Sequence, residues 1–115
     1  MSFKVTTNRS AIRARIKRGE AAAIPVASMQ ALKDCNYYCR EDQGTLISSS
    51  YSNSVLEKGL LVWDTSYAKK VYLTGIPSKD KNSNASLMWC DKAEKTYGKD
   101  WEAIFEKAFL RGMGR

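Results

Sequence analysis

Apolar residues recur with a helical period near the amino end of the chain. Ile12 and Ile16 lie one helical turn apart, so they would share a face. Thr7 and Asn8, which come before this pattern, are residue types that commonly cap helices. The pattern predicts a helix over residues 8–18.

Gly19 and Pro25 interrupt this pattern. Proline kinks the interior of a continuous helix, but it is well placed in a first turn. We therefore expect a second, separate helix over about residues 24–38. Its inner stripe would consist of Met29, Leu32, Cys35 and Cys39.

The pattern changes in the middle of the chain, where it predicts a small antiparallel sheet. Residues 45–53 alternate loosely, with Ile47 and Tyr51 on one face and mostly serine on the other. Residues 60–64 follow a turn and are apolar on both faces, which is typical of a central strand. The expected hairpin covers about residues 45–64, and its serine face is either exposed or covered by neighbouring subunits.

Polar residues directly after this hairpin predict a short helix over about residues 66–73. Tyr67 and Val71 would form its buried pair, one turn apart. The candidate caps are Asp64, Thr65 and Ser66. Asp64 could instead be an acid in a pocket, but no partner base is visible and the cap is the favoured interpretation.

The last third of the chain is a polar loop, residues 75–86, followed by a long helical pattern. An apolar stripe continues across Gly98 and predicts a long or bent helix over about residues 85–111, capped by Ser83 or Asn84. The stripe consists of Trp89, Ala93, Tyr97, Trp101, Ile104, Phe105, Ala108 and Phe109.

These elements predict one α+β domain over residues 1–115, with a basic amino-terminal segment 1–18 and the polar loop 75–86. A chain of 115 residues with 43% hydrophobic residues fits a single globular core. No apolar stretch is long enough to cross a bilayer, and the amino end lacks the pattern of a signal peptide. We therefore expect a protein that starts in the cytoplasm, with reduced thiols.

The net charge of +7 comes from 19 basic and 12 acidic residues, and it is concentrated at the amino end. No acidic residue precedes Glu20. The basic residues before it are Lys4, Arg9, Arg13, Arg15, Lys17 and Arg18. Such a block either contacts nucleic acid or an acidic protein surface, or it forms a solvated helix face.

The chain offers little catalytic chemistry. It has no histidine, which removes most general-base pairs and the usual zinc sites, and its seven glycines form no phosphate-binding motif. We expect no enzyme activity, no cofactor and no metal. Cys35, Cys39 and Cys90 either bind a metal or pack as small buried residues, and packing is favoured because a structural zinc site needs four ligands. The tryptophans could stack on bases, but their spacing favours the core.

Three stretches resemble the small minor capsid proteins of tailed bacteriophages that infect Gram-positive bacteria. They are "DCNYYCREDQGTLISSS", "LLVWDTSYAKKVYL" and "SNASLMWCDKAEKTYGKDW". The middle stretch, an apolar-Trp-polar run followed by Tyr-Ala and basic residues, is the most specific. The chain departs from the family at residues 38–40, where the family usually carries a proline, and its amino-terminal helix is not clearly matched.

The resemblance implies an α+β virion protein at the head-to-tail junction, similar to neck and tail-completion proteins, with copies arranged as a ring around the DNA channel. The implied partners are further copies of the chain, the connector or stopper on one side, the tail terminator or tube on the other, and genomic double-stranded DNA, with no membrane. The candidate channel or partner-ring contacts are Arg9, Arg13, Arg15, Lys17 and Arg18. The candidate inter-subunit loop consists of Lys79, Asp80, Lys81 and Asn82.

A second hypothesis from another class is a small basic DNA-binding regulator. Residues 9–18 would then lie along the phosphate backbone of duplex DNA. No recognition-helix motif follows this segment, so the assembly hypothesis is preferred.

Overall fold

The computed structural model describes residues 9–40, 45–79 and 82–114. Within these residues it is all-α, with no β-strand. The elements are α1 (Arg9–Tyr37), α2 (Leu46–Asn53), the 3₁₀ helix η1 (Leu56–Lys58), α3 (Ala68–Leu73) and α4 (Trp89–Gly112). The prediction of an α+β fold is therefore wrong.

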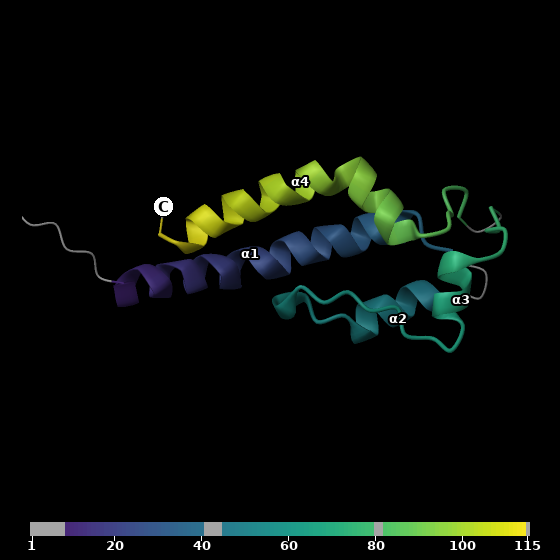
Figure 1. Ribbon diagram of the computed structural model, residues 1–115, viewed down its shortest axis with the longest axis horizontal. Helices are drawn as coiled ribbons and strands as arrows, with labels where there is room; N and C mark the ends of the chain where they lie inside the picture. Colours follow the sequence, from purple (N-terminus) through teal and green to yellow (C-terminus); the bar gives the residue numbers. More distant parts are fainter. Residues whose placement is uncertain (1–8, 41–44, 80–81, 115) are drawn as a thin grey trace, which may run out of the picture.

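The two long helices form an antiparallel hairpin that runs the length of the molecule (Figure 1). α1 has 29 residues and is therefore about 43 Å long at 1.5 Å per residue. α4 returns along it for most of that length, with a bend near its start, while α2 and α3 lie on the opposite side of α1 (Figure 1). The short elements thus lie along the carboxyl half of α1, with η1 beside its middle, and none lies beside its first turns (Figure 1).

The predicted break in the amino-terminal helix does not occur, because α1 continues through both Gly19 and Pro25. Gly19 is buried against α4, and a Cβ added there would lie 2.8 Å from the ring of Phe109. The glycine therefore serves close packing of the two helices rather than a chain break. Pro25 removes one backbone hydrogen bond from α1, and the helix that continues through it packs on α4.

The segment expected to be the first strand, residues 45–53, is instead helix α2. Leu46 and Ser50 lie one turn apart and are the buried pair of this helix. The hydroxyls of Ser49 and Ser50 donate to backbone carbonyls three residues earlier, at 2.6 Å in both cases. Serine can bond its own helix in this way, and the loose alternation in the sequence did not distinguish a strand from a helix with a small buried residue.

The segment expected to be the central strand, residues 60–64, is extended but has no strand partner. The only ladder-type pairing recorded in the described chain is one isolated antiparallel bridge between Val55 and Leu60. Backbone N–H groups beyond it donate to serine side chains instead: Val62 to Ser54 at 2.9 Å and Asp64 to Ser49 at 3.1 Å. Serine hydroxyls thus replace the backbone acceptors that a neighbouring strand would supply.

The core lies at the end of the hairpin that carries α2 and α3 (Figure 1). Its centre is Trp89, which is 1% exposed and packs edge-on against Trp63 and Tyr72. Ala68 of α3 and Leu46 of α2 are buried in the same cluster, and Tyr67 and Val71 pack against it. Those two residues lie where the sequence pattern expected a buried pair.

α4 begins at Trp89 rather than at residue 85, and neither Ser83 nor Asn84 caps it. The residue before the helix is Met88, which has φ 47° and ψ 52°, a left-handed conformation that favours glycine or asparagine. Its N–H donates to the carbonyl of Tyr72 at 2.8 Å, so a contact with α3 holds the start of α4. A long-range contact of this kind leaves no cap signal in the sequence.

Candidate interaction surface

The first turns of α1 project past the end of α4 (Figure 1). We call residues 9–18 the projecting segment, and its last residues, from Arg15 to Arg18, lie beside the end of α4. Every residue of this projecting segment is exposed, including Ile12 at 48% and Ile16 at 38%. Both isoleucines lie on the helix face that carries Gly19 and Ala23, which are buried further along the hairpin. The stripe that packs against α4 therefore continues into solvent after α4 has ended.

The projecting segment also carries the candidate contact residues that the sequence identified at the amino end. All five are exposed. They are Arg9, Arg13, Arg15, Lys17 and Arg18. Arg15 is tied to its own chain, because its Nε donates to the carbonyl of Met113 at 3.3 Å. The remaining cations are available to a partner.

The candidate inter-subunit loop behaves differently. Asp80 and Lys81 lie outside the described residues. Lys79 donates from Nζ to the carbonyl of Ala85 at 2.6 Å. Asn82 donates from Nδ2 to the carbonyls at positions 37 and 39, at 3.0 and 2.9 Å, where α1 ends. Lys79 and Asn82 therefore make contacts that secure their own subunit.

A groove of about 540 Å³ lies between α1 and α4, further along the hairpin from the projecting segment. Its floor combines an alanine, a glycine and two aromatic rings, and both charged residues that line it are acidic. The lining residues are Ala27, Glu94, Gly98, Trp101, Glu102 and Phe105. Glu94 and Glu102 are exposed, whereas the four apolar residues are half-buried. We call this the acid-rimmed groove.

Trp101 is held in position by a hydrogen bond to α1. Its indole Nε1 donates to Oδ2 of Asp34 in α1 at 2.7 Å, and the other carboxylate oxygen of Asp34 accepts from Gln30 at 3.1 Å. The ring orientation is thus fixed by a hydrogen bond to the neighbouring helix. A fixed, half-buried aromatic ring is a common anchor in protein interfaces.

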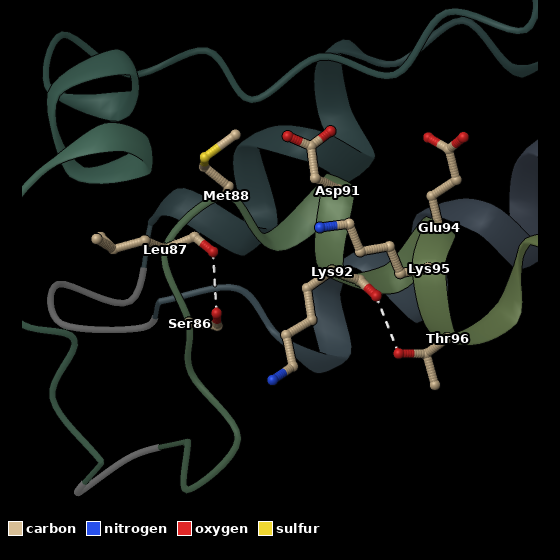
Figure 2. Close-up of a pocket in the computed structure, with 8 residues that line it drawn as sticks. All are labelled: Ser86, Leu87, Met88, Asp91, Lys92, Glu94, Lys95 and Thr96. Atoms are coloured by element: carbon tan, nitrogen blue, oxygen red, sulfur yellow. Dashed lines mark hydrogen bonds between the residues drawn. The ribbon is translucent and has the colours of Figure 1, made fainter.

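A second hollow, of about 680 Å³, lies along the outer face at the start of α4 (Figure 2). Figure 2 shows Asp91 and Lys95 extending into the same region while Lys92 points away from them. The hydroxyls of Ser86 and Thr96 both donate to backbone carbonyls, of Leu87 and Lys92 respectively, at 2.9 Å. The charges in this hollow are of both signs, and both hydroxyls already donate to backbone carbonyls. The lining residues therefore do not indicate a particular ligand.

Asn36 connects α1 to α2 and to the extended segment that carries Trp63. Its Nδ2 donates to Oγ of Ser50 at 2.9 Å, and its Oδ1 accepts from the indole Nε1 of Trp63 at 2.9 Å. Asn36 is 9% exposed and Ser50 is fully buried. A buried polar network of this kind fixes how elements fit together because each member needs its partner.

Arg40 is a buried residue that the sequence did not single out, since nothing in a linear pattern marks an arginine as buried. It is 7% exposed, and its guanidinium donates to the carbonyls of Val71 at 3.1 Å and Thr74 at 2.8 Å. A further bond, at 3.4 Å, reaches the carbonyl of Ile76. Arg40 thereby caps the carboxyl end of α3 from a distant part of the chain.

Cys35 and Cys90 form a thiol pair between α1 and α4. Their hydrogen bond, followed by burial, raises the pKa of Cys35, and the same bond lowers the pKa of Cys90. Cys39 instead donates to the carbonyl of Arg40 at 3.4 Å. In the described parts of the chain no group of three or more His, Cys, Asp or Glu residues is arranged to hold a metal.

None of the described helices is long and apolar enough to span a membrane. Comparison of the chain with family models, with curated proteins and with solved structures found no match in any of the three. Functional inference therefore depends on the residues themselves and on their arrangement.

Proposed function

We propose that this chain is a structural protein of a tailed-phage virion, forming or joining a ring at the junction between the DNA-filled head and the tail. The observation that carries the proposal is the resemblance of "LLVWDTSYAKKVYL", supported by the two flanking stretches, to small minor capsid proteins. The resemblance also implied a sheet, which is absent from the described residues. The proposal therefore depends on the three stretches and the exposed surfaces, and not on a shared fold.

The arrangement of the three stretches in space supports treating them as one unit. Cys35, Trp63 and Trp89 come from the first, second and third stretch respectively, and all belong to the core or pack against it. Residues that pack together constrain one another in sequence, because a change in one leaves a cavity or a clash at the other. A resemblance confined to these stretches is therefore a resemblance in one packed unit.

In this proposal the protein acts by assembly. The core holds a long hairpin whose open end presents exposed isoleucines and cations, which are suited to contacts with other subunits. Partners would be further copies of the chain, the connector or stopper side, and the tail terminator or tube side. In a ring, the cations of each copy would add up to a positive belt that faces either DNA or an acidic partner.

The test is electron microscopy of lysates from a phage with an early stop codon in the corresponding gene. We expect DNA-filled heads beside separate, unattached tails, and restoration of joined particles when the intact gene is supplied in trans. Complete infectious particles without the protein would refute the proposal.

A small DNA-binding regulator is the second candidate, favoured by the exposed cations of the projecting segment. It predicts that the isolated protein binds duplex DNA with an affinity that falls steeply with salt. The logarithm of the binding constant should fall against the logarithm of the salt concentration with a slope of about −0.9 for each phosphate contacted. Absence of binding at moderate salt would exclude this candidate and leave the assembly role unaffected.

A further inference from the structure

The projecting segment and the acid-rimmed groove have complementary chemistry, although they lie on different parts of the same chain. The segment offers Ile12 and Ile16, at 48% and 38% exposure, flanked by cations. The groove offers half-buried Trp101 and Phe105, flanked by Glu94 and Glu102. Apolar surface rimmed by opposite charges on the two sides is the arrangement found where proteins associate.

The spacing of the charges also agrees. Glu94 and Glu102 are eight residues apart on α4 and therefore about 12 Å apart along its axis. Arg9 and Lys17 are separated by the same eight residues on α1, with Arg13 between them on the same side of the helix. A helix docked along the groove can therefore place one cation near each carboxylate.

One chain cannot make this contact with itself, because both surfaces lie on the rigid α1–α4 hairpin at different positions along it (Figure 1). We propose that the projecting segment, residues 9–18, docks into the acid-rimmed groove of a second copy of this chain. The inference builds on the proposed function, since it identifies the contact that would join subunits within the ring.

Charge favours this contact between two unlike surfaces over a contact between two like surfaces. Pairing two projecting segments would oppose Arg9, Arg13 and Lys17 of one copy to the same cations of the other. Pairing two grooves would similarly oppose carboxylates to carboxylates. Like charges placed together disfavour the wrong partner. A contact between two different surfaces of one chain repeats from copy to copy, and it closes into a ring when the rotation allows.

The experiment is sedimentation velocity of the full chain over a range of concentrations. We expect the wild type to form larger species with increasing concentration, and to lose them when salt shortens the Debye length to about 3 Å, near 1 M. The double variants R9E/K17E and E94K/E102K should each weaken association by about tenfold or more, because each puts like charges at the contact. All four positions are exposed, so both variants should retain the helical circular dichroism spectrum.

Two further samples identify the contact. An equal mixture of the two double variants, and the quadruple variant R9E/K17E/E94K/E102K, should both regain association, because each restores opposite charges. The matched control is K69E/K70E, which removes the same charge from exposed positions on α3 and should associate like the wild type.

The inference is overturned if the wild type remains monomeric at every concentration, if either double variant associates normally, or if neither the mixture nor the quadruple variant recovers. A monomer that instead binds duplex DNA through the projecting segment would also overturn it, in favour of the regulator. Failure here combined with unattached tails in the stop-codon phage would leave the junction role in place and reject only this contact.

Discussion

The two ends of the helical hairpin differ in whether they contain a buried core. At the aromatic end, which we define as the cluster around Trp89 with α2, α3 and the segments joining them, an aromatic core is buried beneath a surface on which Tyr51, Leu60 and Leu73 are exposed. At the open end, which consists of the projecting segment 9–18 and the last turns of α4, the isoleucines and the cations are exposed. The same helix, α1, takes part in both ends.

This difference separates the part of the chain that maintains the fold from the part available for contacts. Burial of aromatic surface supplies stability in proportion to the area removed from water. Exposed apolar side chains contribute little to folding. At the open end the isoleucines continue a packing stripe beyond its partner helix and are flanked by cations, which supports a role in association. Substitutions at the aromatic end should therefore alter stability, and those at the open end should alter association.

The largest expected effect is at Trp89. Replacing it with Ala removes a ring that is 1% exposed and should lower the free energy of unfolding by about 3–5 kcal/mol. The matched change at the open end, Ile16→Ala, should cost less than about 1 kcal/mol because that side chain is already exposed. Urea unfolding followed by circular dichroism measures both. Similar losses of unfolding free energy in the two variants would contradict the conclusion that only the aromatic end maintains the fold.

Arg40 should come next. Arg40→Ala leaves the carbonyls of Val71, Thr74 and Ile76 without their donor, and we expect a loss of about 2–3 kcal/mol. Arg40→Lys keeps the charge but cannot reach several carbonyls at once, so it should recover only part of the loss. Hydrogen exchange of α3 reports the local effect. Full recovery with lysine would mean that the charge, and not the fork of donors, is what matters.

The sequence predicted the positions of the apolar core well but not the form of the elements around it. Tyr67, Val71 and Trp89 all lie in or against the core, because helical spacing marks a buried face directly. Residues 45–64 were predicted wrongly, since Ser50 is buried through partners on α1 that no local pattern reveals. Local periodicity indicates which residues prefer burial. Whether residues 45–53 form a strand or a helix depends on long-range contacts, which local periodicity does not show.

Of the two surfaces proposed to make contact, one could be predicted from the sequence and the other could not. The cations of the projecting segment were identifiable because charge clustering is a local property. The acid-rimmed groove was not, since it combines Ala27 of α1 with residues of α4 that follow about 70 positions later. Sites assembled from distant parts of the chain become visible only when the helices are placed side by side.

The closeness of the two helices can be tested with glycines. A Cβ at Gly112 would lie 2.7 Å from both the Cβ of Ala22 and the backbone oxygen of Arg18, so Gly112→Ala should destabilise by about 1–2 kcal/mol. At Gly98 the nearest atom would be Cγ of Glu94 at 3.5 Å, an ordinary contact. Gly98→Ala should therefore stabilise the helix by about 0.5–1 kcal/mol. Thermal unfolding should show opposite shifts, and shifts of the same sign would contradict the close approach at Gly112.

Cys90 should be the first thiol to react with an alkylating reagent. It is half-buried with a lowered pKa, whereas Cys35 and Cys39 are 2% and 0% exposed. We expect rapid modification at one position in the native protein, and at the other two only after unfolding. Mass spectrometry of peptides identifies the site, with Cys90→Ser as the control that should abolish the rapid phase. Modification of all three at one rate would show that the aromatic end opens readily.

The smallest effect should be at high pH, at Tyr72. Burial, followed by the nearby Cys90, raises the pKa of this phenol to about 12 from an ordinary value of about 10. Since the folded state favours the neutral phenol, its contribution to stability is complete below about pH 10 and is lost as the pH rises towards 12. Absorbance at 295 nm should reveal a late-titrating tyrosine that is missing in Tyr72→Phe. If the late step persists in Tyr72→Phe, it belongs to another tyrosine, and the burial of Tyr72 against Trp89 loses its support. If the late step disappears, it belongs to Tyr72.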